Sequence, residues 1–144
     1  MVIVSSFVTN DPSPQRLGGE PIMIHKTLDF NATNASANDV IETLKILKGT
    51  FVHSVHTRVS TVESDTMTLD VGDGDDPNGY DDAVDGNSAP SNGACSGIST
   101  IGTDAYAVGK KYTADDTIDI VLDNDADTVI LEVYALISRD ESSS

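Results

Sequence analysis

Seven aspartates between residues 70 and 85 are the densest group of side chains in this sequence that could do chemistry. They stand at positions 70, 73, 75, 76, 81, 82 and 85. Carboxylates are ligands that Ca²⁺ prefers, so we compared the segment with the EF-hand calcium loop. A loop that starts at Asp73 has Pro77 at a ligand position, and a loop that starts at Asp81 has Ala83 at one. We therefore expect a solvated acidic loop with no metal and no cofactor, and a looser calcium site is the alternative.

The histidines and the cysteine do not form a predicted metal or redox site. His53 and His56 are three residues apart, and such positions point to opposite faces of a strand. We therefore expect that they do not share a zinc ion, and that His53 is a partly buried, hydrogen-bonded side chain. Cys95 is the single cysteine, which excludes an internal disulfide, and its neighbours carry no base or cation that would activate a thiolate.

Enzyme signatures are missing from the sequence. There is no G-x-S-x-G nucleophile elbow. The glycines of Gly72-Asp73-Gly74 follow a strand pattern as those of a phosphate loop do, but the surrounding aspartates would repel a phosphate. Composition leaves room for a pair of carboxylates of the glycosidase type, although the chain has no Trp to stack on a sugar. We expect no enzymatic activity, and a small hydrolase is kept as a third hypothesis.

The charge of the chain limits its partners. The formal net charge is −16, from 8 basic and 24 acidic residues, and residues 59–109 contain no Lys or Arg. Nucleic acids and anionic membranes draw much of their affinity from basic side chains, so neither is an expected partner. No segment approaches the ~20 apolar residues of a membrane span, and the first residues lack the basic start of a secretory signal. We expect a chain made in a cytoplasm, with an acidity that serves solubility.

The segments that must position these residues have the composition and periodicity of β-strands. Val (14), Ile (11) and Thr (14) outnumber Leu (8), and β-branched side chains favour strands. Residues 22–30, 66–71 and 117–122 alternate apolar and polar with period two. Residues 128–137 are apolar on nearly both faces, which is typical of a central strand. About eight short strands in one domain predict a β-sandwich, and among sandwiches a jelly roll.

Three segments are less clear in the sequence. Residues 39–48 fit either a strand or a helix of barely three turns, which Asn38 would cap at its N-terminus. Residues 72–97 predict one long acidic loop, because they are rich in Gly, Asp, Asn and Ser. A short strand is expected near residues 106–108.

Residues 1–21 are predicted to form an N-terminal arm, because prolines and glycines interrupt any regular structure there. The arm has five apolar residues that need burial: Val2, Ile3, Val4, Phe7 and Val8. They could complete the chain's own sheet, or they could add a strand to a neighbouring subunit. We take them as candidate interface residues.

Residues 39–80 resemble a pattern found in small structural proteins of tailed bacteriophages. The pattern has a strand like residues 39–42, a turn like Gly49-Thr50, a long strand, and a segment like residues 68–74, which read TLDVGDG. A later segment like residues 112–118, YTADDTI, and a final apolar strand complete it. The resemblance covers most of residues 39–137. It leaves out the arm, and residues 82–100 are longer and richer in Gly and Ser than the pattern.

This resemblance implies a jelly-roll β-sandwich in which residues 39–48 form a strand, and a place in the virion as a capsid decoration or cement protein. We expect an arm at 1–21 and a sandwich domain at 22–144. The expected partners are the lattice of the major capsid protein and further copies of the chain, as a homo-oligomer and most simply a trimer, on the outer capsid surface. A calcium-dependent carbohydrate- or receptor-binding module of a phage tail is the alternative function.

Overall fold

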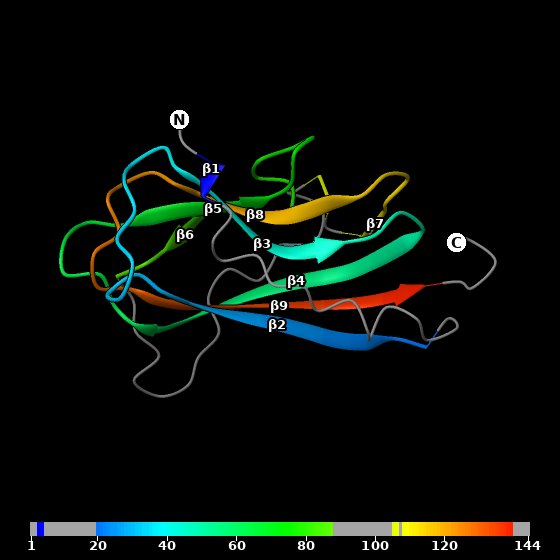
Figure 1. The fold of residues 1–144 in the computed structure, drawn as a ribbon, viewed down its shortest axis with the longest axis horizontal. Helices are drawn as coiled ribbons and strands as arrows, with labels where there is room; N and C mark the ends of the chain where they lie inside the picture. The colour runs from blue at the N-terminus through cyan, green and yellow to red at the C-terminus, as the bar shows by residue number, and fades with distance from the viewer. Residues whose placement is uncertain (1–2, 5–19, 88–104, 107, 140–144) are drawn as a thin grey trace.

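The computed structural model describes residues 3–4, 20–87, 105–106 and 108–139, and in these residues every regular element is a β-strand (Figure 1). The strands are β1 (Ile3–Val4), β2 (Ile22–Asp29), β3 (Val40–Ile46), β4 (Thr50–Thr61), β5 (Thr68–Gly72), β6 (Asp81–Asp85), β7 (Lys110–Lys111), β8 (Asp116–Leu122) and β9 (Ile130–Arg139). The described part of the chain includes no helix that is long and apolar enough to cross a membrane.

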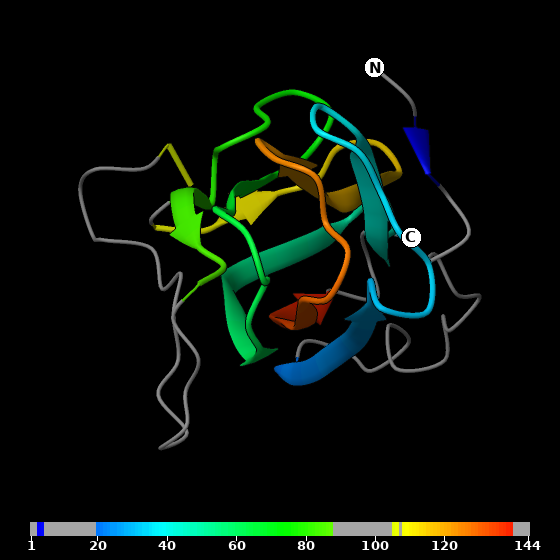
Figure 2. The same cartoon turned by 90° about the vertical axis from the view of Figure 1, so that its left-hand side faces the viewer.

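The strands form two facing sheets whose topology is that of a jelly roll. One sheet has the order β1-β3-β8-β5-β6 and is called here the β8 sheet; the other has the order β2-β9-β4-β7 and is called the β9 sheet. The pairs β2–β9, β3–β8, β4–β7 and β5–β6 are all antiparallel, so the chain is arranged as one long hairpin rolled over on itself. Figures 1 and 2 show the two layers from two sides. The predicted all-β, jelly-roll sandwich is confirmed.

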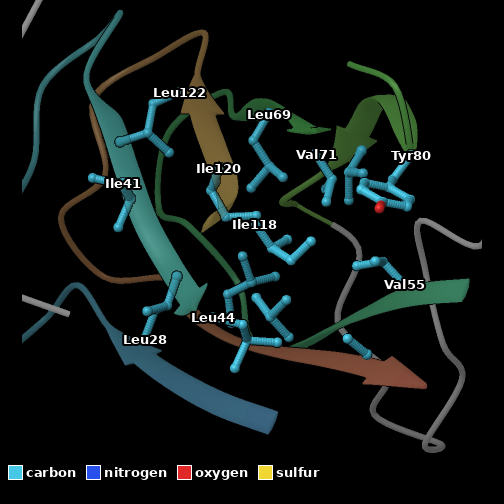
Figure 3. Close-up of a cluster of buried hydrophobic side chains, with 14 of the residues drawn as sticks. Leu28, Ile41, Leu44, Val55, Leu69, Val71, Tyr80, Ile118, Ile120 and Leu122 are labelled. Carbon is cyan, nitrogen blue, oxygen red and sulfur yellow. The ribbon is translucent and has the colours of Figure 1, made fainter. Parts of the chain in front are cut away.

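The hydrophobic core lies between the two sheets. On β8, Ile118, Ile120 and Leu122 are fully buried and point toward the β9 sheet, as the period-two pattern predicts (Figure 3). On β9, alternate residues from Leu131 to Ile137 face them, and β9 is a central strand between β2 and β4. The alternation of apolar and polar residues along β8 and β9 therefore decides which face of each sheet packs against the other sheet.

Residues 39–48 contain a strand, and a β-bulge explains why their pattern resembles a helix. The register between β3 and β8 shifts between Glu42 and Leu44. One extra residue in a bulge changes the side that the following residues face, so both Ile41 and Leu44 point into the core, three positions apart. The hydroxyl of the extra residue, Thr43, is buried and donates a hydrogen bond of 2.7 Å to the carbonyl of Ile118.

A second bulge changes the predicted faces of β4. The sequence pattern places Phe51 and His53 on the same face as Val55. The register shifts between Val52 and Ser54, so that Val52 and Val55 are buried while Phe51 is half-buried and His53 is exposed. The expectation of a partly buried His53 is therefore wrong, because alternation continues in phase only without a bulge.

Two further expectations differ from the structure in the segment after β5. Strand β6 lies inside residues 72–97, for which the sequence predicts one long loop, and residues 88–97 lie outside the described residues. The short strand expected near residues 106–108 is found later, as β7. Tyr106 and Val108 belong to a turn instead, and Gly109 has a φ of 93°, a conformation that favours glycine.

A short part of the predicted arm pairs with the chain's own sheet. Ile3 and Val4 form β1, which is parallel to β3 with Ile3 opposite Val40 and Val4 opposite Ile41. Val2, Phe7 and Val8 lie outside the described residues. A role of the arm in contacts between chains therefore stays a prediction.

Candidate functional site

The acidic segment after β5 folds around one buried carboxylate, that of Asp73. Its residue is 2% exposed. The backbone N–H groups of Asp75 and Asp76 each donate to Asp73 Oδ1 at 3.0 Å, and Asp73 N donates to the carbonyl of Asp76 at 3.0 Å. This tight turn requires a glycine before it, since a Cβ on Gly72 would lie 2.1 Å from the carbonyl oxygen of Asp76. The sequence Gly72-Asp73 thus closes the loop locally and points the carboxylate inward.

Three side chains from the region of β7 converge on the same carboxylate. Lys110 Nζ lies 2.6 Å from Asp73 Oδ2, and the hydroxyl of Tyr112 donates to the same oxygen at 2.6 Å. The hydroxyl of Tyr106 donates to Asp73 Oδ1 at 3.1 Å. Because Asp73 follows β5 of the β8 sheet while Lys110 belongs to β7 of the β9 sheet, these bonds tie the two sheets together.

Aromatic rings enclose the lysine of this cluster. Lys110 Nζ lies 4.4 Å from the centroid of the Tyr106 ring and 4.6 Å from that of Tyr112, within the range of cation–π attraction. Tyr80 is buried, its ring meets that of Tyr106 edge to face, and its hydroxyl is 2.8 Å from the hydroxyl of Tyr112. The sequence did not indicate this arrangement, because the three tyrosines come from positions as far apart as 80 and 112.

The electrostatics keep the cluster in one protonation state. Burial by itself would raise the pKa of Asp73, but the hydrogen bonds from Lys110, Tyr112 and the backbone lower that pKa overall. Burial disfavours the charged form of Lys110, yet its bonds to Asp73, Tyr106 and Asp75 raise its pKa. Burial raises the pKa of Tyr112 far above the usual value of a phenol. At neutral pH the cluster is an ion pair among neutral phenols, which suits a structural link rather than proton transfer.

The acidic cluster does not fit the calcium site that the sequence left open. Carboxylates of Asp73, Asp75 and Asp116 lie within 4.8 Å of one another. However, Lys110 Nζ is 2.6 Å from Asp73 and 3.2 Å from Asp75, so the ammonium stands where a cation would bind. Ca²⁺ takes about six to eight oxygen ligands. The lysine therefore supplies a positive charge to the carboxylates of Asp73 and Asp75.

Further carboxylates crowd the outer face of the β8 sheet. This acidic face is defined by Glu42 of β3, Asp119 of β8, Asp70 of β5 and Asp82 of β6. Asp119 lies opposite Glu42 in the strand register, is 7% exposed, and accepts a hydrogen bond of 2.6 Å from the hydroxyl of Thr117. Burial, followed by the charges of Asp116 and Glu42, raises the pKa of Asp119 to about 7. Burial, followed by the neighbouring Asp123 and Asp82, also raises the pKa of Asp70.

Glu63 forms a second buried link that sequence reasoning missed. It follows β4 and is buried, and its Oε2 accepts hydrogen bonds from the backbone of Asp127, Thr128 and Val129 at 2.9, 3.0 and 3.1 Å. Burial would raise its pKa, but these bonds and one from Ser64 lower it overall. The charge thus fixes the turn between β8 and β9. A lone glutamate before a polar turn carries no sequence signal for this role.

The predicted positions of the histidines need one correction. Because of the bulge after Val52, His53 and His56 lie on the same outer face of the β9 sheet and not on opposite faces. They have separate partners: His53 Nε2 is 2.8 Å from Ser138 Oγ, and His56 Nε2 is 3.2 Å from Ser54 Oγ. Cys95 lies outside the described residues.

Comparisons with known proteins find the fold and not a sequence family. No protein-family model and no curated protein sequence matches the chain. Its structure is similar to a chain of the cyanophage Pam1 capsid asymmetric unit, with a TM-score of 0.59 and 19% identity over 83% of this chain and 85% of that one. It is similar to a chain of the acidic stable capsid of Helicobacter pylori bacteriophage KHP30, with a TM-score of 0.58 and 15% identity over 85% and 90%. A third similar chain, from the capsid of Ralstonia phage GP4, has a TM-score of 0.53 and 16% identity over 85% and 86%. The same β-sandwich thus extends over most of all four chains.

Proposed function

We propose that the protein is a non-enzymatic structural protein of a tailed-phage virion, which decorates and stabilises the outer surface of the capsid after synthesis in the host cytoplasm. The observation that carries this proposal is the extent of the structural likeness. In three phage capsids, a chain of the same fold matches 83–85% of this chain. The resemblance of residues 39–80 and 112–118 to small phage structural proteins rests on the sequence and supports the same function.

The chemistry of the site supports a structural role. The most densely hydrogen-bonded polar cluster described above joins the two sheets, and each of its charges is balanced inside the cluster. A catalytic acid or base works best with a pKa near the working pH. In the cluster the pKa of the carboxyl is lowered and the pKa values of the ammonium and phenols are raised, so each group is held away from that range.

The charge of the acidic face favours an orientation on the capsid in which this face points toward solvent. Carboxylates spread over an outward surface repel those of other particles and oppose aggregation. Glu42, Asp70 and Asp82 lie on the outer side of the β8 sheet. A decoration protein seated with the other layer toward the shell would present this charge to solvent.

The assembly that we propose is a trimer at the local threefold points of the lattice, held partly by residues 1–21. Identical subunits usually associate with closed rotational symmetry, and sheet edges favour pairing between chains. Val2, Ile3, Val4, Phe7 and Val8 would supply the apolar part of this contact. Within the described residues, β1 pairs with β3 through Ile3 and Val4, and a short pairing of this kind would leave the sandwich intact if the arm reached a neighbouring chain.

Binding to particles tests the proposal. Particles of the encoding phage that lack the protein would be mixed with purified full-length chain and with a chain that lacks residues 1–15, and bound protein would be measured after sedimentation. We expect the full-length chain to bind in a fixed ratio to the shell subunit and the truncated chain to fold but to bind more weakly. Binding of both chains with equal affinity would refute the role of the arm. Failure of the full-length chain to bind would refute the proposed function.

A further inference from the structure

The outer face of the β9 sheet differs in character from the acidic face. Cross-strand register places its side chains in rows over β2, β9 and β4: Met23 with Leu136 and Ser54, His25 with Tyr134 and His56, and Thr27 with Glu132 and Arg58. Phe51 and His53 extend the same face at the start of β4. We call this surface the histidine face, because it carries all three histidines of the chain.

Contacts within the histidine face hold its larger side chains in place. The rings of His25 and Tyr134 have centroids 5.5 Å apart, and those of Phe51 and His53 are 4.8 Å apart, edge to face. His53 is also bonded to Ser138. Side chains that are ordered before binding lose less conformational entropy when a partner covers them.

Charge separates the two outer faces more sharply. Glu132 is bonded to both Arg58 and the hydroxyl of Tyr134, so its charge is balanced on the histidine face. On the acidic face, Asp70 lies beside Asp82, and Asp119 lies opposite Glu42. A chain that binds a lattice must bury part of its surface, and removal of unbalanced carboxylates from water is costly. Of the two faces, the histidine face is the one that a protein surface can cover at low electrostatic cost.

The composition of the histidine face also fits a protein contact. Tyr, Phe, Met and Arg are enriched in the cores of protein interfaces, where unpaired acidic residues are depleted. Met23 is 51% exposed, which is unusual for a large apolar side chain on a strand next to half-buried apolar neighbours. Leu136 lies beside it in the same row and is half-buried.

We propose that the histidine face is the surface through which this protein docks on the capsid shell. Its partner is a shell surface with aliphatic side chains and few unbalanced charges, which matches the exposed Met23, the half-buried Leu136 beside it and the internally balanced pair of Arg58 and Glu132. The inference rests on the proposed function and adds to it the face that meets the lattice. It also fixes the orientation, since the acidic face of the other sheet then points away from the shell.

Two variants with the same change in charge test this inference. Met23→Glu/His25→Glu adds two negative charges to the histidine face, with His25 counted as neutral. Lys45→Glu changes the charge by the same amount at an exposed position of β3, next to the acidic face. Circular dichroism and thermal melts confirm that each variant is folded. Binding to particles that lack the protein is then compared with that of the unchanged chain, and oligomeric state is measured by sedimentation.

We expect the double variant to bind the shell at least about tenfold more weakly and Lys45→Glu to bind within about threefold of the unchanged chain. Equal binding of the double variant and the unchanged chain would overturn the inference, although the proposed function would stand because the unchanged chain binds. A larger loss with Lys45→Glu would assign docking to the acidic face and overturn it too. If the double variant instead dissociates an oligomer and leaves shell binding unaltered, the face serves a second copy of the chain, and the inference is wrong.

Discussion

Replacement of Asp73 by Asn removes the charge at the centre of the link between the two sheets. Asn can keep an oxygen toward the backbone N–H groups of Asp75 and Asp76, which bond to Asp73 Oδ1. Its amide group then faces Lys110 Nζ and the hydroxyl of Tyr112, both of which are donors bonded at 2.6 Å to Oδ2. The substitution therefore removes the buried counter-charge of a largely buried ammonium, which keeps its bond to the exposed carboxylate of Asp75.

The expected cost follows from this geometry. Breaking a buried ion pair by removal of one partner costs about 3–5 kcal/mol. This is a large part of the roughly 5–15 kcal/mol that stabilises a typical domain, so Asp73→Asn should still fold but should melt about 10–20 °C lower. Asp75→Asn is the matched control, because the Asp75 side chain bonds to the same ammonium at 3.2 Å but is 80% exposed. An exposed pair contributes about 1 kcal/mol or less.

The assay is urea unfolding followed by circular dichroism at several pH values. Since the pKa of Asp73 is lowered in the folded protein, its stabilising effect is complete above the pKa of the unfolded chain and is lost as the pH falls through the folded pKa. The difference between the unchanged protein and Asp73→Asn should be constant near neutral pH and shrink below about pH 4. A cost under about 1 kcal/mol at pH 7, or equal costs for Asp73→Asn and Asp75→Asn, would refute the structural role of the cluster.

Three other predictions follow from the buried carboxylates and the lysine. The pKa of Asp119 is about 7 in the folded protein and lies above that of an unfolded aspartate, so the free energy of unfolding should fall as the pH rises from about 4 to 7. At pH 8, Asp119→Asn should be about 1–3 kcal/mol more stable than the unchanged protein. Urea unfolding at pH 5 and 8 checks this, and a less stable variant at pH 8 contradicts it. Glu63→Gln should lower the free energy of unfolding by about 2–3 kcal/mol in the same assay, because three backbone N–H groups lose a charged acceptor. Glu20→Gln, at an exposed position, is the control and should have little effect. Equal costs for the two variants would argue against the structural link at Glu63. Because Lys110 occupies the space among the loop carboxylates, a chelator should change the melting temperature by less than about 2 °C, and a much larger drop would show that a metal supports the fold.

Alternation of apolar residues was sufficient to predict the sandwich where the strands are regular. On β8 and β9 each side chain faces the side that period two indicates. The prediction failed for β4, where a bulge after Val52 reverses the phase, and bulges have no fixed signature in a single sequence. The bulge at Thr43 misled in another way, since it gave the apolar residues of a strand the spacing of a helix. There the resemblance to phage proteins, and not the local pattern, gave the strand.

The buried polar links were not predictable, because they depend on contacts between distant segments. The sequence indicated an acidic segment around Asp73 but gave no reason to join it to Lys110 or to Tyr112, which lie beyond residues 88–104. The pairing of Asp119 with Glu42 required the register of β3 and β8. The outward position of Asp119 itself could have been read from the alternation of residues 116–122, in which Ile118 and Ile120 face the core.

Electron cryomicroscopy of purified particles of the phage that encodes this chain tests the central claim most directly. We predict density for this jelly roll at regular positions on the outer surface of the head, with the β9 sheet toward the shell and Glu42 and Asp119 toward solvent. Density for the chain in the tail, or particles that do not contain the chain, would contradict its role as a capsid decoration protein.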